Sequence, residues 1–176
     1  MAVILVRHTR PAVAEGVCYG RLDIDAADSF AAEAAAVLAA VPACDRLVTS
    51  PARRCRRLAD HIAVAHRLPV AVDPALAEMD FGHWEGRTWE DIGTESLDAW
   101  AADFLRFRGH GGESVEQFAR RVRAALARHD SPDERVLIVC HAGVIRCALA
   151  GNADDPEAWT RPVPYGSVHW AEPDRC

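Results

Sequence analysis

The chain has 176 residues, of which 50% are hydrophobic and 26% are charged, and its formal net charge is -6. This length suits one domain with a substantial core, and the composition is ordinary for a globular protein. The acidic balance gives no reason to expect nucleic acid or an anionic membrane surface as a partner. There is no apolar run of about 18 residues and no signal-peptide pattern, so we expect no membrane contact and a cytoplasmic location.

All of the strongly basic side chains are arginines, since the sequence contains no lysine. A guanidinium binds oxyanions through two parallel hydrogen bonds, which an ammonium group cannot do. The six cysteines include no C-x-x-C pair. We therefore expect reduced thiols that fill the core, and neither disulfides nor a zinc site. No metal and no other cofactor is expected.

The first predicted element is a buried strand over residues 3–6, which is short, apolar and rich in β-branched side chains. Arg7, His8 and Thr9 leave this strand at its carboxyl end, where open α/β sheets place their ligand crevice. A histidine in such a loop is either solvated or part of a site, and the motifs further along the chain favour a site.

A loop over residues 10–28 follows, broken by proline, glycine and aspartate. It carries Arg21, which either reaches a substrate or lies on the surface. A helix is predicted over residues 29–41, because apolar side chains recur on one face and Pro42 stops it. A second strand is predicted over residues 46–49.

Ser50 as N-cap and Pro51 at the first helical position predict a second helix that runs to about His66. Arginines crowd its first two turns, at Arg53, Arg54, Arg56 and Arg57. Positive charge is unfavourable at a helix N-terminus, and a bound anion would relieve the repulsion. We expect one of these arginines to point inward.

A third strand over residues 69–72 leads into an ordered loop over residues 75–86, which mixes apolar side chains, carboxylates and glycines without a helical or strand period. Its Glu78 is either an exposed loop carboxylate or a general acid. Shelter by Phe81 and Trp84 would raise the pKa of Glu78, as a general acid requires.

Two helices are predicted next. The first covers residues 97–105 and ends at the glycines of residues 109–112. The second is longer and starts at Ser114, which forms a capping-box pattern with Gln117. His129 near its end suits the negative end of the helix dipole better than a catalytic role.

The most strand-like run covers residues 136–140 and ends in His141. Small residues follow, so the backbone could approach a ligand closely before a helix over residues 144–149. A last, edge strand is predicted over residues 167–171, with Trp170 turned inward and His169 on the other face.

Strands alternating with helices predict an α/β fold, a three-layer sandwich in which helices flank a mostly parallel sheet. Parallel strands end at the same edge, so His8, Glu78 and His141 should converge there with the turn over residues 50–54. Two histidines, at least two arginines and a carboxylate suit a doubly charged oxyanion. Phosphoryl transfer needs charge neutralisation, an in-line nucleophile and an acid for the leaving oxygen.

Five segments resemble the motifs of the histidine phosphatase superfamily, in the family's order and along nearly the whole chain. They are residues 5–9, 50–54, 78–86, 111–114 and 141–146. The resemblance implies the phosphoglycerate mutase-like fold, as a single domain over residues 1–176 with a small helical cap around residues 80–112.

The resemblance also implies roles for individual side chains. His8 would be the nucleophile that becomes phosphohistidine. Arg7, Arg54 and His141 would hold the phosphoryl group. Glu78 would be the general acid and then the base that activates water. The nearby arginines should lower the pKa of His8 and keep it able to attack.

Three positions depart from the family's pattern. Thr9 and Ala142 stand where glycine is usual, and Ala52 stands where a larger apolar residue is common. None of these changes removes a reacting group, so the resemblance still implies a catalyst.

Residues 7–11, taken with residues 18–23, resemble the α-ribazole phosphatase branch of cobalamin biosynthesis. In that branch Arg21 would reach the ribose or base side of the substrate. The candidate substrate-binding residues are Thr9, Arg21, Ala142 and Glu113.

Other functions remain open. A broad-specificity phosphatase or a phosphohistidine phosphatase would use the same fold, whereas the chain is short for a phosphoglycerate mutase. A non-catalytic phosphate-binding domain is disfavoured because every reacting group is present. A metal-binding module is disfavoured because the His and Cys spacings fit no compact ligand pattern. The expected partner is a small-molecule phosphate ester, bound by a monomer or a homodimer.

Overall fold

The structure is a computed structural model that describes residues 3–150 and 156–171. Its sheet has the strand order β3-β2-β4-β1-β5. The strands are β1 (Val3–Arg7), β2 (Arg46–Thr49), β3 (Val70–Val72), β4 (Val136–Cys140) and β5 (Val168–Ala171). All neighbouring pairs are parallel except β1 with β5. The predicted α/β fold with a mostly parallel sheet is confirmed.

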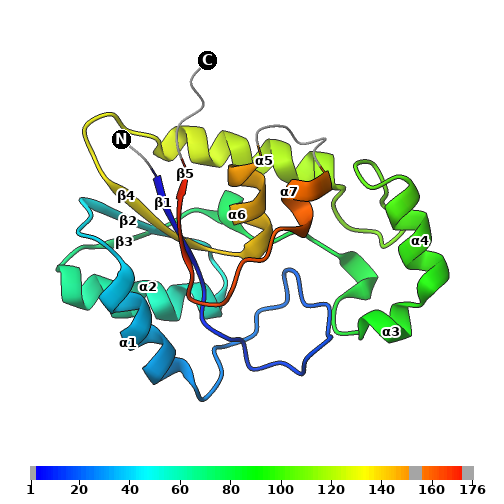
Figure 1. Ribbon diagram of the computed structural model, residues 1–176, viewed down its shortest axis with the longest axis horizontal. Helices are drawn as coiled ribbons and strands as arrows, with labels where there is room; N and C mark the ends of the chain where they lie inside the picture. The colour runs from blue at the N-terminus through cyan, green and yellow to red at the C-terminus, as the bar shows by residue number, and fades with distance from the viewer. Residues whose placement is uncertain (1–2, 151–155, 172–176) are drawn as a thin grey trace.

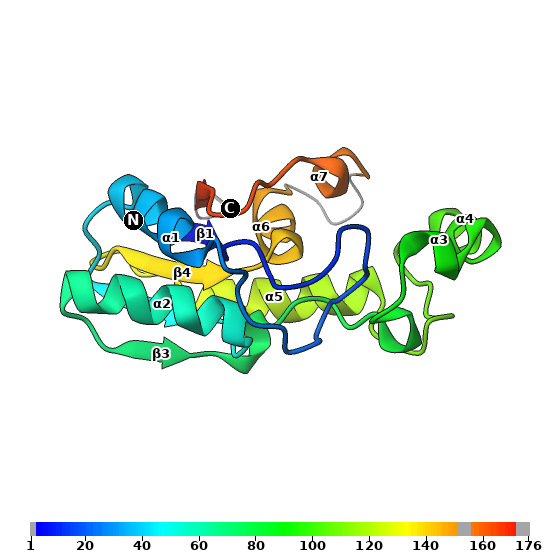
Figure 2. The ribbon, with the colours of Figure 1, turned by 90° about the horizontal axis from the view of Figure 1, so that it is seen from below.

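Helices cover both faces of this sheet (Figure 1, Figure 2). α1 (Phe30–Ala40) and α2 (Arg53–His66) pack on one face, and α5 (Val115–His129) and α6 (Ala142–Leu149) pack on the other. The shorter elements are α3 (Trp89–Ile92), α4 (Thr94–Ala102), α7 (Pro156–Thr160) and the 3-10 turns η1 (Pro74–Leu76) and η2 (Gly82–Trp84). The sheet is therefore the middle of three layers, as predicted.

The alternation of side chains along β1 explains why this strand is apolar throughout. Ile4 and Val6 join the core that α1 and α2 cover, while Val3 and Leu5 join the core under α5 and α6. A central strand buried on both faces needs apolar side chains in both directions. β1 is thus fixed firmly on both sides just before the chain reaches His8.

α3 and α4 lie at one end of the molecule, away from the sheet (Figure 2). Aromatic rings join them to the rest of the chain, since the ring centroid of Trp100 lies 6.0 Å from that of Phe81 and 5.9 Å from that of Trp84. The predicted helix over residues 97–105 ends earlier than expected, at Ala102. Beyond it, Phe104 packs against Trp159 of α7 at a centroid distance of 5.9 Å.

The predicted start of α2 is wrong. The helix begins at Arg53, and its N-cap is Ala52, which offers no side-chain hydrogen bond. The Ser50 hydroxyl lies instead 2.7 Å from Nε2 of His141. The hydroxyl still accepts from Ala52 N–H at 3.4 Å, but its shorter hydrogen bond is with this buried imidazole at the sheet edge.

The inward orientation expected for Trp170 is also wrong, because 52% of this residue is exposed. Trp170 pairs with Ile4 across the antiparallel β1–β5 ladder, so the two side chains share a face of the sheet. Ile4 lies under α1 and α2, whereas β5 is the edge strand. An edge position leaves a large side chain beyond the cover of those helices.

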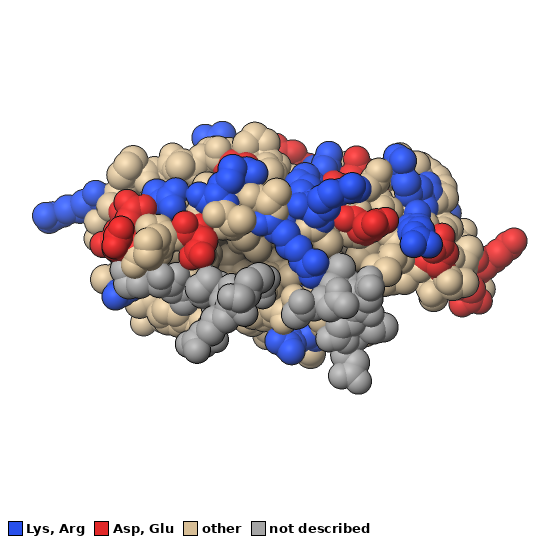
Figure 3. All heavy atoms as spheres, turned by 90° about the horizontal axis from the view of Figure 1, so that it is seen from above, with Lys and Arg blue, Asp and Glu red and all other residues tan. Residues whose placement is uncertain are grey.

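Within residues 3–150 and 156–171, no helix has the length and apolar character needed to cross a membrane. On the face drawn in Figure 3, arginines and carboxylates are interspersed. The described cysteines, which are Cys18, Cys44, Cys55, Cys140 and Cys147, are free thiols as predicted. Cys176 lies outside the described residues.

Candidate active site

Two histidines meet at the carboxyl ends of β1 and β4. Arg7 pairs with Cys140 in the parallel β1–β4 ladder, so His8 and His141 leave the sheet side by side. Their ring centroids are 5.2 Å apart and their exposures are 1% and 0%. The strand order of the sheet therefore brings together two side chains that are far apart in the sequence.

The hydrogen bond of His8 determines which of its nitrogens is available. Nδ1 of His8 lies 2.6 Å from the carbonyl oxygen of Thr9. A carbonyl oxygen only accepts, so Nδ1 carries the proton and Nε2 keeps its lone pair. Burial lowers the pKa of His8 well below its usual value, and the charges of Arg54 and Arg7 lower it further. The expected direction is confirmed, although burial rather than the arginines is the largest cause.

His141 is also kept neutral by its surroundings. Its Nδ1 faces Nη2 of Arg54 at 3.3 Å, and a guanidinium only donates, so Nδ1 accepts. Nε2 then carries the proton and donates to Ser50 at 2.7 Å. Burial lowers the pKa of His141 well below its usual value, with His8 and Arg54 adding to the effect.

Two guanidinium groups give the site its positive charge. Arg54 is fully buried and donates to the carbonyl oxygens of Leu22 at 2.7 Å and Gly20 at 2.8 Å. The guanidinium carbon of Arg7 lies 3.8 Å from the ring centroid of Tyr165. No carboxylate in the described part of the chain lies within 4 Å of either guanidinium. A cation buried without a counter-charge is costly, so this arrangement favours a bound anion.

Glu78 approaches from the loop after β3. Its Oε2 accepts a hydrogen bond from the backbone N–H of Gly143 at 3.1 Å, and its Oε1 accepts one from Met79 N–H at 3.0 Å. A Cβ atom at Gly143 would lie 2.3 Å from Oε1, so only glycine leaves room for this carboxylate. Trp84 is expected to shelter Glu78, but its ring packs instead against that of His110, with the ring centroids 4.9 Å apart.

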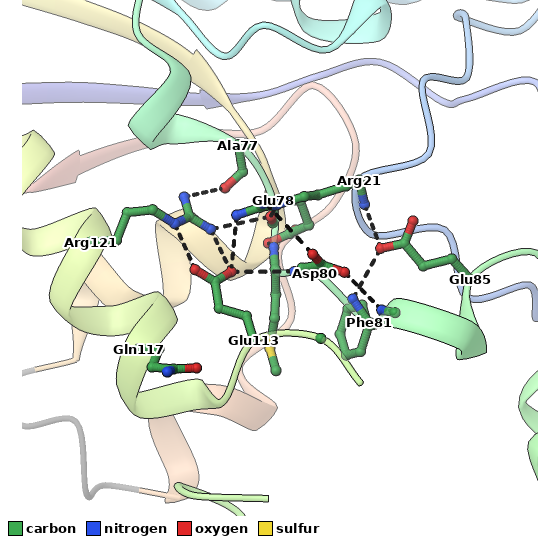
Figure 4. A network of polar contacts seen from close by, with 12 residues as sticks. Arg21, Ala77, Glu78, Asp80, Phe81, Glu85, Glu113, Gln117 and Arg121 are labelled. Atoms are coloured by element: carbon green, nitrogen blue, oxygen red, sulfur yellow. Dashed lines mark hydrogen bonds and ion pairs between the residues drawn. The ribbon is translucent and has the colours of Figure 1, made fainter. Parts of the chain in front are cut away.

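Two other predicted site residues, Arg21 and Glu113, lie beside Glu78 (Figure 4). Arg21 reaches the carbonyl oxygen of Glu78 at 3.4 Å and the Glu113 carboxylate at 3.4 Å. Glu113 itself receives two hydrogen bonds from Arg121, at 2.8 and 2.7 Å. Ala142 opens α6 beside the site, and Thr9 contributes its carbonyl to His8.

Two hollows meet at Glu78. A polar one of about 380 Å³ is lined by residues that include Arg21, Arg54 and His141. A larger one of about 710 Å³ has mainly aromatic walls, among them Trp89, Trp100, Phe104, Phe118, Trp159 and Tyr165. Because Glu78 borders both hollows, its carboxylate stands between a place for an anion and a place for an apolar group.

Residues 3–176 match the profile of the histidine phosphatase superfamily, branch 1. The chain belongs to this superfamily. The superfamily and the phosphatase names of its relatives identify the chain as a phosphatase enzyme.

Individual relatives differ in their named substrates. An adenosylcobalamin/alpha-ribazole phosphatase of Salmonella typhimurium is 33% identical over 139 residues, which are 75% of this chain and 68% of that protein. A glucosyl-3-phosphoglycerate phosphatase of Mycobacterium tuberculosis is 30% identical over 140 residues, which are 72% of this chain and 62% of that protein. The crystal structure of an alpha-ribazole phosphatase from Shigella flexneri shares the fold, with a TM-score of 0.85, 24% identity, and coverage of 99% of this chain and 92% of that chain.

Sequence reasoning missed several residues of this histidine phosphatase site. The sequence pattern predicts Ser50 as a helix cap, whereas its hydroxyl accepts a hydrogen bond from Nε2 of His141. Tyr19 and Tyr165, the only tyrosines of the chain, have hydroxyl groups 3.3 Å apart beside Arg7. Arg146 lies in the last matching motif and lines the larger cavity. No local pattern marks the tyrosines, because the fold brings them together over 146 residues.

The buried histidines should make stability depend on pH: the pKa values of His8 and His141 are lowered well below the usual value, and that of buried His110 is lowered as well. Their folded-state pKa values are lowered, so the unfolded chain binds protons first as the pH falls through about 6.5. The free energy of unfolding should then fall by up to about 1.4 kcal/mol per pH unit for each histidine. Urea unfolding in phosphate-free buffer from about pH 7.5 to about pH 5.5 measures this slope. His8→Asn should reduce it, and an unchanged slope would show that His8 is not buried in the neutral form.

Gly143→Ala tests the position of the Glu78 carboxylate. The added methyl group would meet Oε1 of Glu78, so the carboxylate must move. A displacement of about 1 Å can cost about 10²-fold in rate, and kcat/KM should fall by that order. Alanine favours a helix over glycine, but its methyl group would also lie 3.1 Å from Cζ of buried Phe118, so the melting temperature is measured alongside the rate. Unchanged kcat/KM in a folded variant would contradict the placement of the carboxylate.

Proposed function

We propose that this phosphatase hydrolyses phosphomonoesters through a phosphohistidine at His8, without a metal, and that α-ribazole 5'-phosphate is its substrate. The observation that carries the chemistry is the pair of guanidiniums without a carboxylate counter-charge among the described residues, next to a histidine with a free Nε2 lone pair. Arginines can neutralise the equatorial oxygens of a phosphoryl group, which is the main requirement of this reaction.

In the first step the Nε2 lone pair of His8 attacks phosphorus. The bond from phosphorus to the leaving oxygen breaks, and that oxygen takes a proton from Glu78. Arg7 and Arg54 neutralise the three remaining oxygens, and His141 turns its Nε2–H from Ser50 to one of them when the substrate binds. The low pKa of His8 keeps Nε2 unprotonated, and the Thr9 carbonyl keeps the ring oriented.

In the second step water attacks phosphorus. The Glu78 carboxylate takes a proton from this water, the P–N bond breaks, and inorganic phosphate and free His8 result. Glu78 borders both hollows, so it has access to the leaving group in the first step and to water in the second. One carboxylate then serves as acid and as base.

The larger cavity supports a leaving group that carries an aromatic ring. In α-ribazole 5'-phosphate the ribose that carries the phosphate also carries a flat aromatic base. Trp89 and Trp100 stack with ring planes 7° apart on one wall of the 710 Å³ cavity. Aromatic walls favour flat aromatic ligands through face and edge contacts. The relative from Salmonella typhimurium bears an α-ribazole phosphatase name, which supports the same substrate.

The proposal gives the segment over residues 80–112 the function of a cap, because it supplies Trp89 and Trp100 to the cavity. Arg21, at the rim of the polar hollow, would contact the ribose. Thr9 and Ala142 would line the bottom of the substrate pocket. Glu113 would not contact the substrate and would instead hold the loop that carries Glu78.

One observation favours a second candidate substrate. Arg146 lines the larger cavity, and its Nε donates to the Arg161 carbonyl at 2.9 Å. A guanidinium there could bind a carboxylate on the leaving group, as a phosphoglycerate-type ester would present. The relative from Mycobacterium tuberculosis is named for such a substrate.

We infer a cytoplasmic enzyme that acts on small esters as a monomer or a homodimer. Free thiols at five described cysteines fit a reducing compartment.

The substrate proposal predicts a strong preference in a panel. Hydrolysis of α-ribazole 5'-phosphate in EDTA should exceed that of 4-nitrophenyl phosphate and 3-phosphoglycerate by several orders of magnitude in kcat/KM. The His8→Ala variant should lose activity on all three, and wild-type protein quenched in alkali should carry phosphohistidine.

The panel also separates the alternatives. Similar, slow turnover of all substrates would leave a broad-specificity phosphatase and remove the α-ribazole assignment. Preference for 3-phosphoglycerate, lost in Arg146→Met, would favour the second candidate. The absence of both turnover and phosphohistidine would favour a non-catalytic phosphate-binding domain.

Glu78→Gln tests the acid. A glutamine cannot give up a proton, so substrates with a poor leaving group should slow by about 10²- to 10⁴-fold. 4-Nitrophenyl phosphate needs little protonation of its leaving oxygen, and its kcat/KM should change far less. Equal kcat/KM for wild type and variant on an alkyl phosphate would remove Glu78 from the mechanism.

A further inference from the structure

The segment that carries Glu78 lacks regular hydrogen bonding of its own. Between β3 and α3 it forms only the short turns η1 and η2. Backbone carbonyls outside helices and strands need other donors, or they are left unsatisfied when buried. The position of Glu78 therefore depends on side chains from elsewhere in the fold.

Arg121 of α5 supplies those donors. Its Nη1 donates to the carbonyl oxygens of Ala75 at 2.8 Å and Ala77 at 2.9 Å, and its Nη2 donates to that of Glu78 at 3.3 Å. The remaining N–H groups, on Nε and Nη2, donate to Glu113. All five guanidinium N–H groups thus have acceptors, and three of these acceptors are carbonyls of the Glu78 segment (Figure 4).

Glu113 fixes the direction of this guanidinium. Two parallel hydrogen bonds to one carboxylate define the plane of an arginine fork. Glu113 is itself tied to the segment, because its N–H donates to the Asp80 carbonyl at 2.9 Å and its carboxylate accepts from Asp80 N–H at 3.3 Å. Its side chain is 13% exposed and that of Arg121 is 20% exposed. The capping box of Ser114 and Gln117 anchors the start of the helix next to it.

The Glu78 residue is consequently held at both ends. Arg121 holds its backbone carbonyl, and Gly143 N–H holds its carboxylate. The carboxylate packs directly against Gly143, where a Cβ atom would lie 2.3 Å from Oε1. A shift of the segment by about an ångström would therefore move the carboxylate away from the Gly143 N–H group.

We propose that Arg121, oriented by Glu113, is a positioning residue that places the Glu78 carboxylate for proton transfer to the leaving oxygen. The inference rests on the proposed function, in which Glu78 is the acid. Arg121 does not touch the phosphoryl group in this proposal. Its loss should therefore weaken acid catalysis and leave the attack by His8 largely intact.

Arg121→Lys is the direct test, because lysine keeps the charge and loses the five-donor fork. On an alkyl phosphate kcat/KM should fall by about 10²-fold, the usual effect of a misplaced catalytic group. On 4-nitrophenyl phosphate it should fall by less than about tenfold, because that leaving group needs little acid. Arg120→Lys, one residue earlier and exposed on the same helix, is the matched control and should leave both values unchanged.

A double-mutant cycle separates positioning from general damage. If Arg121 acts through Glu78, adding Arg121→Lys to Glu78→Gln should cause no further loss on the alkyl phosphate. Glu113→Gln should produce the same pattern more weakly, since it leaves the carbonyl contacts of Arg121 in place, and it serves if Arg121→Lys does not fold.

Equal losses on both substrates, or additive losses in the cycle, would overturn the inference while leaving the phosphatase chemistry standing. A wild-type protein that hydrolyses neither substrate and forms no phosphohistidine would instead overturn the proposed function itself.

Discussion

The site depends on positive charge that has no carboxylate partner within 4 Å among residues 3–150 and 156–171. Arg54 is fully buried, and its hydrogen bonds go to the neutral carbonyls of Gly20 and Leu22. Arg7 rests on the ring of Tyr165. Unpaired burial of a charge costs on the order of several kcal/mol, and neutral acceptors offset only part of it. Carbonyls and rings orient a cation but leave its charge in place, so the pocket remains complementary to an anion before any ligand arrives.

The same positive charge adds to the effect of burial on His8 and His141. Burial disfavours their protonated forms, and the neighbouring guanidiniums add to that effect, so both imidazoles stay neutral. A hydrogen bond at one nitrogen is then enough to fix the tautomer of each ring. His8 has the Thr9 carbonyl as its acceptor, which leaves Nε2 free, whereas His141 uses both nitrogens, on Ser50 and Arg54. The difference in hydrogen bonding leaves a free lone pair on His8 alone of the two rings, as the proposed nucleophile requires.

The strands, the long helices and the convergence of His8 with His141 could be predicted, because they follow from apolar periodicity and from the way parallel strands end at one edge. Ser50 and Trp170 were misread for a shared reason. A serine before a proline is a good cap only if no stronger partner claims its hydroxyl, and a strand tryptophan is buried only if a helix covers it. Both conditions are set by residues distant in sequence: His141 lies 91 positions from Ser50. The pairing of Tyr19 with Tyr165 could not be predicted for the same reason, because the two residues are 146 positions apart.

Catalytic precision has two different sources in this fold. His8 and His141 follow directly from β1 and β4, so the hydrogen-bonded ladder of the sheet fixes them. Glu78 follows the short edge strand β3 and two 3-10 turns, where no ladder reaches. The acid of the proposed mechanism therefore depends on contacts from Arg121 of α5 and Gly143 of α6. In the proposed function the segment over residues 80–112 and these contacts border the leaving group rather than the phosphoryl group, so they are free to vary with the substrate alcohol while the sheet edge stays the same. Relatives that differ in their named substrates but share the superfamily fit this separation.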